Sequence, residues 1–536
     1  MKIMIMREKN IKFVIITLLL IFSSSAHSQS DTIETNVPAL KDVFANDFYI
    51  GCLLSYPHIK FPNDPPVPGA ANTALAPNGG YLIKYHMNSM SPGNNMKPQY
   101  TIDMNASTTA YNNAASDAER DSANVNPVVR FNGNLIAQLD WAERQGFTFR
   151  GHTLVWHSQT PGTGFFRTGY NAQAEYLTPE LMNQRMENYI KEVIRILHED
   201  WPGLLSAMDV VNEAINDGSG TDRTNGNEWY TVYGDMSYIM KAFEYTRKYT
   251  EEYGETQIKL YYNDYNTHDP AKADGIVRLC TPIYQAGFLD GIGMQEHNAW
   301  NDYPTAGEWI ASYNKFDPIC DEIAVTEFDV QLNTTSPSAQ QLELQANQYA
   351  QLFKCFLERS YFSGRGKVIT VAKDGLNDEW TFRSQTASSL WDRFNKTKPA
   401  FFAVVDVGVN YNQLDSLIAY ADTLNETEYT AESWNTFAAA VELAQSSMNQ
   451  NYSSSVSAAA SLTEANSSLS TAVAGLVKIT TDVEDYNSAP KIFALQQNYP
   501  NPFNPVTRIK YSVPSNSYVS LKVFNSLGQE IATLFE

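Results

Sequence analysis

The chain has 536 residues, of which 43% are hydrophobic, so it is long enough for two to four domains and at least one large core. Its 38 basic and 59 acidic side chains give a formal net charge of −21. This excess of acidic side chains argues against nucleic acid and anionic membrane surfaces as partners, because proteins bind both through clusters of basic side chains. A neutral polymer would not be repelled.

Residues 1–28 have the pattern of a secretory signal peptide. Basic residues between Lys2 and Lys12 precede an apolar run over 13–22, and small residues follow it. A run of about ten apolar residues is too short to span a bilayer as a stable helix. We predict cleavage near residues 28–29 and a secreted or cell-surface location, with no membrane span after cleavage. An uncleaved anchor is the alternative.

Residues 36–405 alternate between strand-like and helix-like patterns. Amphipathic helices are expected over 135–145, 181–198 and 236–253, and inserted loops over 62–80 and 105–126. The expected strands cover 48–54, 82–87, 147–155, 205–212, 258–263, 291–295, 322–328 and 367–371. Eight strand-then-helix units of this length predict an α/β fold, the (β/α)8 TIM barrel, in which active groups sit at the carboxyl ends of the strands.

Two of these strands end in a glutamate. Glu213 follows a short apolar strand pattern, and Glu327 follows another further along the chain. Burying a carboxylate at the end of a buried strand costs free energy, so such a group is expected to be paired with another group or to serve a function. The carboxyl ends of parallel barrel strands lie together, so the two acids are expected to converge. Such a pair is the machinery of glycosidic bond cleavage.

Most of the other expected strands also end in polar residues, and five runs are distinctive. They are WHSQ at 156–159, DVVNEA at 209–214, NDYN at 263–266, GxGxQxH at 291–297 and TEFD at 326–329. In this order and spacing they resemble family 10 of the glycoside hydrolases, the retaining endo-β-1,4-xylanases. The resemblance covers about residues 40–405.

The resemblance implies a role for each of ten residues. Glu213 would be the acid/base and Glu327 the nucleophile, with their carboxyl groups about 5–5.5 Å apart as retention requires. Asn212 would bind the 2-hydroxyl of the reacting sugar, and His297 would orient the nucleophile with Gln295 beside it. The remaining sugar contacts would be Asn94, Lys97, His152 and Trp156, with Trp380 matching a family tryptophan near the eighth strand. Nothing in the sequence indicates a metal or an organic cofactor.

Three positions depart from the family pattern. Where the family usually reads TPENxMKW, Gly93 replaces the substrate-binding glutamate and Pro98 replaces the tryptophan. Where the family has a WG pair, Asp374 precedes Gly375. The catalytic pair is unaffected, whereas the substrate preference is left open.

The expected function is therefore a secreted endo-1,4-β-xylanase that acts on xylan or a related β-1,4-linked polysaccharide. The alternatives are a β-1,4-glucan-active hydrolase of the same fold and a catalytically weakened glycan-binding barrel.

The composition changes after about residue 405. Three Ala/Ser-rich segments within 410–478 have helical spacing and predict a three-helix bundle. This bundle resembles the FIVAR modules of bacterial surface proteins, and it would serve either in binding or as a spacer.

The last segment, residues 488–536, begins with a turn-rich run over 498–505 and continues with strand-like alternation. It predicts a truncated β-sandwich and resembles part of the sorting domain of the type 9 secretion system. The machinery of that system is the expected export partner, and the sequence is expected to be cut short.

The four cysteines are too few for a disulfide framework in a chain of this size. Buried inert thiols are expected, and the sequence does not choose among possible pairings. The residues are Cys52, Cys280, Cys320 and Cys355.

Overall fold

The computed structural model describes residues 16–17, 33–61, 76, 78–479, 492–499, 501, 506–514, 518–525 and 528–535. The chain forms two compact units, one from residues 31–425 with 431–476 and the other from residues 1–30, 426–430 and 477–536. Most of the predicted signal peptide and most of the 62–80 insertion lie outside the described residues.

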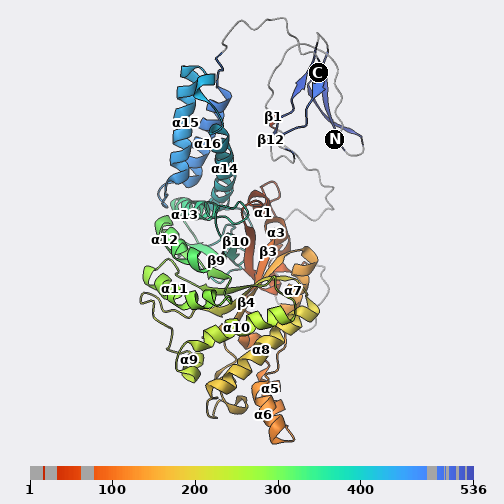
Figure 1. Ribbon diagram of the computed structural model, residues 1–536, viewed down its shortest axis with the longest axis vertical. Coiled ribbons are helices and arrows are strands. Elements are labelled where there is room, and N and C mark those ends of the chain that lie inside the picture. Colours follow the sequence, from red (N-terminus) through yellow and green to blue (C-terminus); the bar gives the residue numbers. More distant parts are fainter. Residues whose placement is uncertain are drawn as a thin grey trace. The chain divides into compact units, whose positions relative to one another are not determined.

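Eight parallel strands close into a barrel, as the sequence predicted (Figure 1). The strand order is β10-β2-β3-β4-β5-β6-β7-β9, β9 pairs back to β10, and β8 pairs in parallel with the last residues of β9. The strands are β2 (Tyr49–Leu54), β3 (Ser89–Pro92), β4 (Thr148–Trp156), β5 (Leu205–Asn212), β6 (Lys259–Asp264), β7 (Gly291–Met294), β8 (His297–Ala299), β9 (Glu322–Gln331) and β10 (Val368–Asp374). Because all these pairings are parallel, the carboxyl ends of the strands meet at one end of the barrel.

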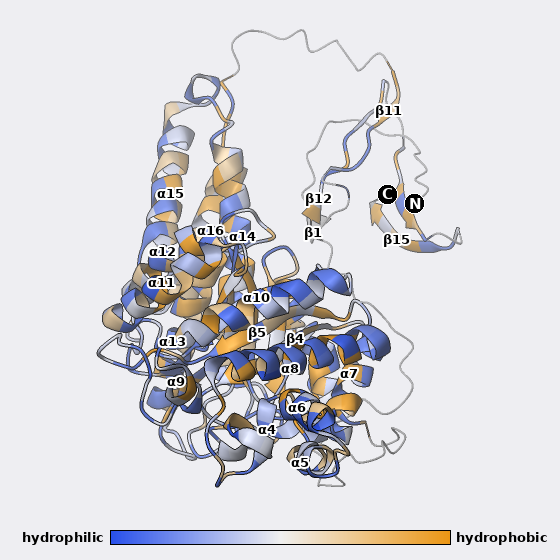
Figure 2. Ribbon diagram, turned by 60° about the horizontal axis from the view of Figure 1, so that its bottom comes forward, coloured by the Kyte–Doolittle hydropathy of each residue, from blue (hydrophilic) through white to orange (hydrophobic). Residues whose placement is uncertain are grey.

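Helices cover the outside of the barrel with their apolar faces turned inward. Helix α8 starts where Thr178 caps it and Pro179 occupies its first turn. It buries Met186, Ile190 and Val193 along one face, and in Figure 2 its outer face is hydrophilic.

The helices of this unit are α1 (Leu40–Val43), α2 (Tyr56–Ile59), α3 (Gly79–His86), α4 (Pro98–Thr101), α5 (Met104–Asn112), α6 (Asp117–Val125), α7 (Gly133–Gln145), α8 (Pro179–Asp200), α9 (Glu228–Tyr233), α10 (Ser237–Glu252), α11 (Pro270–Gln285), α12 (Ala306–Phe316), α13 (Ala339–Leu357), α14 (Pro399–Ala421), α15 (Ala431–Asn449) and α16 (Ala458–Ala474).

Two expectations for the early part of the barrel are wrong. The segment 82–87, expected as a strand, lies mostly in α3, and the second barrel strand is β3. Leu82, Ile83 and His86 are buried at helical spacing, and so short a run does not distinguish helix from strand. The segment 105–126, expected as a loop, forms most of α5 and α6, whose first turns are capped by Asp103 and Ser116.

Helix α14 belongs to the barrel and to the helical bundle at once. Its first half buries Phe401 and Val404, and its second half buries Leu414. The boundary expected between residues 405 and 410 therefore falls inside one continuous helix. Helices α15 and α16 add Phe437 and Leu462 to the same hydrophobic core.

Polar contacts also join the bundle to the barrel. The backbone N–H and the hydroxyl of Ser454, in the α15–α16 loop, donate to the carboxylate of Asp302 at 2.5 and 3.1 Å. The amide of Asn347 on α13 donates to the Ser454 carbonyl at 3.0 Å. The bundle thus packs on the barrel as part of one compact unit.

The second unit contains short antiparallel strand pairs, in keeping with the expected β-rich end. The pairs are β1 (Ile16–Thr17) with β12 (Val506–Thr507), β11 (Ala494–Leu495) with β13 (Tyr511–Ser512), and β14 (Leu521–Phe524) with β15 (Glu530–Phe535).

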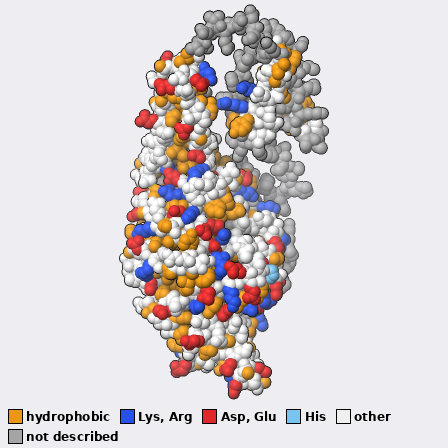
Figure 3. All heavy atoms as spheres, in the orientation of Figure 1, with side chains coloured by type: hydrophobic (Ala, Val, Ile, Leu, Met, Phe, Trp, Pro, Cys, Tyr) orange, Lys and Arg blue, Asp and Glu red, His pale blue; other side chains and the backbone are white. Residues whose placement is uncertain are grey.

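Three further expectations concern charge, membranes and thiols. On the face seen in Figure 3, acidic and basic side chains are interspersed. Among the helices that the structure describes, none combines the length and the apolar character needed to cross a membrane. All four cysteines are buried and unpaired, as expected, and burial raises the pKa of Cys52 and Cys355 to about 12.

Candidate active site

A cavity of about 660 Å³ lies at the carboxyl ends of the barrel strands, and all ten predicted site residues line it. They come from elements far apart in the sequence, which the closed parallel barrel brings together. Asn94 and Lys97 follow β3, His152 and Trp156 lie on β4, Asn212 and Glu213 stand at the end of β5, Gln295 and His297 follow β7, Glu327 lies on β9, and Trp380 follows β10.

Glu213 is surrounded by neutral hydrogen-bond donors. Its carboxylate accepts from the Trp156 indole N–H at 3.0 Å and from the Gln295 amide at 3.0 Å. Burial raises the pKa of Glu213, the Gln295 hydrogen bond opposes this, and the nearby charge of Glu327 adds to the rise, so the pKa lies above its ordinary value. A carboxyl group with a raised pKa stays protonated closer to neutral pH and is suited to donate a proton.

Glu327 is surrounded by cations instead. Its carboxylate lies 3.2 Å from Nε2 of His297 and accepts from the Asn263 amide at 3.3 Å. Burial alone would raise the pKa of Glu327, but the His297 hydrogen bond and the positive charges of His152, His297 and Arg150 outweigh it and hold the pKa well below its usual range. This carboxylate is therefore ionised and suited to act as a nucleophile.

Side-chain amides connect the two glutamates. The Asn212 carbonyl oxygen accepts from Asn263 at 3.0 Å and from Gln295 at 3.3 Å. These same two amides also donate to Glu327 and Glu213, respectively. With its oxygen occupied in this way, Asn212 has its NH₂ group left as a donor for a hydroxyl in the cavity.

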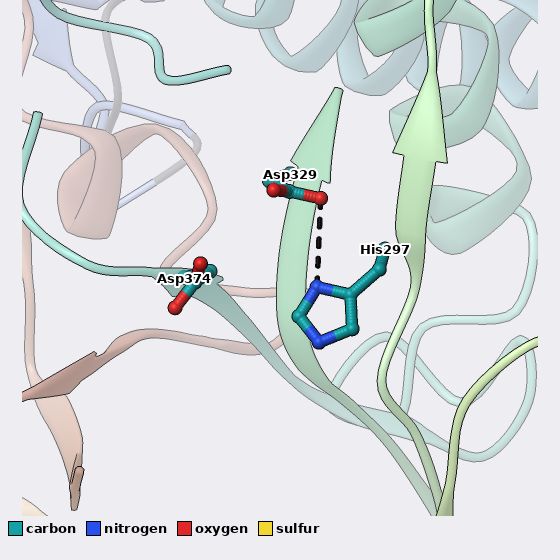
Figure 4. A group of neighbouring side chains, drawn as sticks. All are labelled: His297, Asp329 and Asp374. Atoms are coloured by element: carbon teal, nitrogen blue, oxygen red, sulfur yellow. Dashed lines mark ion pairs between the residues drawn. The ribbon is translucent and has the colours of Figure 1, made fainter. Parts of the chain in front are cut away.

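His297 lies among three carboxylates. Figure 4 shows it beside Asp329 and Asp374, with Nδ1 3.5 Å from the Asp329 carboxylate. Burial alone would lower the pKa of His297, but Asp329 and Glu327 outweigh it and raise that pKa to about 10. The imidazole is therefore protonated and orients Glu327 from its other ring nitrogen.

The same trio has the spacing of a metal site, because one ligand atom from each of His297, Asp329 and Asp374 lies within 4.8 Å of the others. A protonated imidazole does not ligate a metal, however. Arg383 also places Nε 3.2 Å from the Asp329 carboxylate. These charges indicate that the cluster positions the nucleophile Glu327 rather than binding a metal cation.

A second buried network lies beneath the cavity. Asp209 on β5 pairs with the Arg150 guanidinium and with Nδ1 of His152, the latter at 2.7 Å. Arg150 also donates to the Thr326 carbonyl at 3.3 Å. Sequence reasoning gave Arg150 no role, although a cation inside a buried strand pattern, with an acid in the next strand, is a readable signal.

Lys97 forms part of the wall beside β3. Its ammonium group donates to Asn94 at 2.9 Å and to Gln159 at 2.8 Å, and it lies 4.6 Å from the centre of the Trp156 ring system. Sequence reasoning gave no role to several other residues that line the cavity. These are Leu53, Leu54, Ser55, His58, Ser158, Gln159, Tyr265, Glu379, Thr381 and Phe382. Of these, Ser158, Gln159 and Tyr265 lie inside the distinctive runs.

Comparison with known proteins adds to this geometry. The family model described as glycosyl hydrolase family 10 matches residues 39–407. Endo-1,4-beta-xylanase Y of Acetivibrio thermocellus is 33% identical over an alignment of 396 residues, and the match covers 71% of this chain and 33% of that relative. A putative endo-1,4-beta-xylanase of Caldicellulosiruptor saccharolyticus is 31% identical over an alignment of 325 residues, and the match covers 59% of this chain and 98% of that relative. The chain thus spans about a third of the first relative's length.

Among solved structures, the xylanase 10B modules of Clostridium thermocellum, in complex with xylohexaose, match with a TM-score of 0.58 and 31% identity. This match covers 71% of this chain and 69% of the other.

Proposed function

Because the chain belongs to glycosyl hydrolase family 10, we propose that it is an endo-1,4-β-xylanase that cleaves internal bonds of xylan with retention of configuration. One observation carries the proposal: two glutamates, Glu327 buried and Glu213 half-buried, line one cavity with pKa values displaced in opposite directions. Retaining glycosidases need such a pair, one protonated and one ionised. The xylanases among the relatives support the choice of substrate.

In the first step, Glu327 attacks C1 of the reacting sugar while Glu213 protonates the departing glycosidic oxygen. The product is a covalent glycosyl-enzyme. Once Glu327 is esterified, its negative charge no longer raises the pKa of Glu213. Glu213 then accepts a proton from water, and the water displaces Glu327 from C1. Two displacements restore the original configuration.

The other cavity residues have supporting roles in this proposal. Asn212 donates to the 2-hydroxyl of the reacting sugar, a bond that strengthens in the transition state. His297 fixes Glu327, and Gln295 fixes Glu213. The remaining contacts with the chain of sugars come from Asn94, Lys97, His152, Trp156 and Trp380, all of which line the cavity.

A second candidate is hydrolysis of β-1,4-glucan by the same chemistry. It is favoured by Gly93 and Asp374, which line the cavity where the family pattern has glutamate and tryptophan. Glucose differs from xylose by a C6 hydroxymethyl group, so loss of bulky side chains makes room for it.

One experiment tests both candidates. The protein is incubated with xylan and with β-glucan, and the anomer of each new reducing end is followed by NMR. We expect the β-anomer first, released from xylan. Release from β-glucan alone would favour the second candidate, and an initial α-anomer would contradict retention. No release from either polymer by folded protein would leave only a glycan-binding barrel.

Export by a type 9 secretion machinery is also proposed. The basic and apolar start of the chain supports it, together with the turn-rich run over 498–505. The helical bundle would then space the barrel from the sorting segment. N-terminal sequencing of protein collected outside a host that carries this machinery tests the proposal, with a start near Gln29 expected. Retention of the whole product inside the cells would contradict it.

A further inference from the structure

Glu296 is a buried acid that the mechanism above does not use. It is 2% exposed, and it is not one of the residues that line the cavity. Its neighbours in the chain are Gln295 and His297, each of which contacts one of the two catalytic glutamates. Among the residues that the structure describes, no lysine or arginine forms an ion pair with it. A carboxyl group buried in this way is costly, so its position calls for a physical reason.

The backbone turns at Glu296. Its φ is +60°, in the left-handed region that favours glycine. Strand β7 ends before this turn and β8 begins directly after it. The pairing with β9 shifts by one residue across the turn, from Met294 with Val325 to His297 with Asp329. The left-handed residue therefore lies where the strand must accommodate a change of register.

Two buried donors hold the Glu296 side chain. Oε1 accepts from the Thr267 hydroxyl at 3.2 Å, and Oε2 accepts from the Asn298 amide at 3.0 Å. The Thr267 carbonyl in turn accepts from the hydroxyl of Ser312 on α12 at 2.7 Å. All three of these partners are buried. The turn is thus connected to β8, to the segment after β6 and to α12, and a shorter side chain would leave two buried donors without their acceptor.

The backbone around the turn also contacts the strand of the nucleophile. The Gln295 carbonyl accepts from the Glu327 N–H at 3.0 Å, and the Glu296 carbonyl accepts from the Asp329 N–H at 3.2 Å. The directions in which the side chains of Gln295 and His297 leave the backbone therefore depend on how this turn is fixed.

The Glu296 side chain contributes hydrogen bonds more than charge. Burial raises its pKa to about 7, and the hydrogen bonds from Asn298 and Thr267 and the charge of His297 offset this only in part. The Asn298 carbonyl oxygen has no hydrogen-bond partner among the residues that the structure describes. Rotation of the Asn298 amide can therefore supply an acceptor when the carboxyl group is protonated. The contacts of the turn can be kept in both charge states.

We propose that Glu296 is a positioning residue: by fixing the turn between β7 and β8, it orients Gln295 toward Glu213 and His297 toward Glu327. One buried side chain outside the cavity thus sets the surroundings of both catalytic acids. This inference rests on the proposed xylanase function.

The first test is the pH profile of E296A on xylan. Loss of the Gln295 hydrogen bond raises the pKa of Glu213, and loss of the His297 contact raises that of Glu327. Because Glu213 must be protonated and Glu327 ionised, both limbs of the kcat/KM profile should move to higher pH by about 0.5–1 unit. We expect kcat to fall about 10–10²-fold and KM to stay within about twofold, because the reacting groups are misplaced while the sugar contacts remain. Unmoved limbs in folded E296A overturn the proposal.

Two variants control for charge and for a general loss of stability. E296Q keeps the shape of the side chain, and a rotated Asn298 amide can accept from the new NH₂ group, so both limbs should stay at their wild-type positions. E322A removes another buried glutamate, at the start of β9 and the opposite end of the barrel, where it accepts from the Tyr261 hydroxyl at 2.6 Å. It should lower the melting temperature and leave both limbs unmoved. If either control moves both limbs as far as E296A does, the proposal is overturned.

A milder variant applies if E296A does not fold. T267V removes one of the two donors to Glu296 and keeps the shape of the side chain. It should move both limbs in the same direction as expected for E296A, by a smaller amount. Wild-type limbs in T267V would then overturn the proposal.

Double variants test whether Glu296 acts through its two neighbours. In Q295A/E296A the alkaline limb should lie where it lies in Q295A, and in E296A/H297A the acidic limb should lie where it lies in H297A, because the contact is already lost. If the displacements add instead, Glu296 does not act through these residues and the proposal is overturned. Failure of the proposed function is distinguishable, because wild type and E322A would then release nothing from xylan.

Discussion

The surroundings of the two glutamates differ in charge although both side chains line the same cavity. Around Glu213 the donors are the neutral indole of Trp156 and the neutral amide of Gln295. Around Glu327 stand His297 and Arg150, whose positive charges lower its pKa, together with His152. Burial raises the pKa of both acids, so the charge of the neighbours decides which one is ionised. Two identical side chains thus acquire opposite functions from their contacts.

The largest effect is expected from removing the ionised partner. E327A should lower kcat on xylan by about 10⁴-fold or more, because no covalent intermediate can form. Added azide should restore cleavage of activated aryl xylosides and give a product of inverted configuration, which NMR identifies. Turnover of E327A near the wild-type rate would remove Glu327 from the reaction.

A smaller loss is expected when the protonated partner is removed. E213A should lower kcat on xylan by about 10²–10⁴-fold, the usual contribution of proton transfer. Aryl xylosides with good leaving groups need little protonation, so formation of their glycosyl-enzyme should be nearly unchanged. Burst kinetics on such a substrate measure this step. If E213A and E327A behaved alike there, the two roles would not be distinct.

The third effect concerns the cation beside Glu327. H297A removes a hydrogen bond and a positive charge that both lower the pKa of Glu327. The nucleophile must be ionised, so activity is lost as the pH falls through that pKa, and raising the pKa moves the acidic limb of the kcat/KM profile to higher pH. We expect a loss of about 10–10³-fold at mildly acidic pH. If the acidic limb of folded H297A did not move, His297 would not be the group that keeps Glu327 ionised.

The smallest effect concerns the neutral donor beside Glu213. Gln295 lowers the pKa of Glu213 through its hydrogen bond, so Q295A should raise that pKa. Because Glu213 must be protonated, the alkaline limb of the profile should move to higher pH, and kcat should fall about fivefold. Q295A and H297A are controls for each other, since each should move one limb only. A shift of the same limb in both variants would show that the two surroundings are not separate.

The segments that the sequence predicted well are those with a strong local signal. The apolar strands that end at Asn212 and at the TEFD run were expected almost at their observed bounds, because long buried strands carry many β-branched residues. The strand β3 was missed because its four residues, Ser-Met-Ser-Pro, carry no such signal. The apolar residues just before it predict a strand but fold as α3.

The boundary between the barrel and the bundle shows a second limit of prediction from the sequence. Helix α14 runs from Pro399 to Ala421 without a break, although Gly408 and Asn410, residue types that often end helices, lie inside it. The composition does change there, but composition reports what a segment is made of and not what it packs against.

The sequence by itself determined the alternation of strands and helices, the glutamates at two strand ends and the replacements at Gly93 and Asp374, since all of these are local. Only the tertiary structure decided which groups surround each glutamate. The reason is physical. The pKa of a buried acid and the partner of a buried oxygen depend on distances between residues far apart in the chain, and only the closed barrel sets those distances.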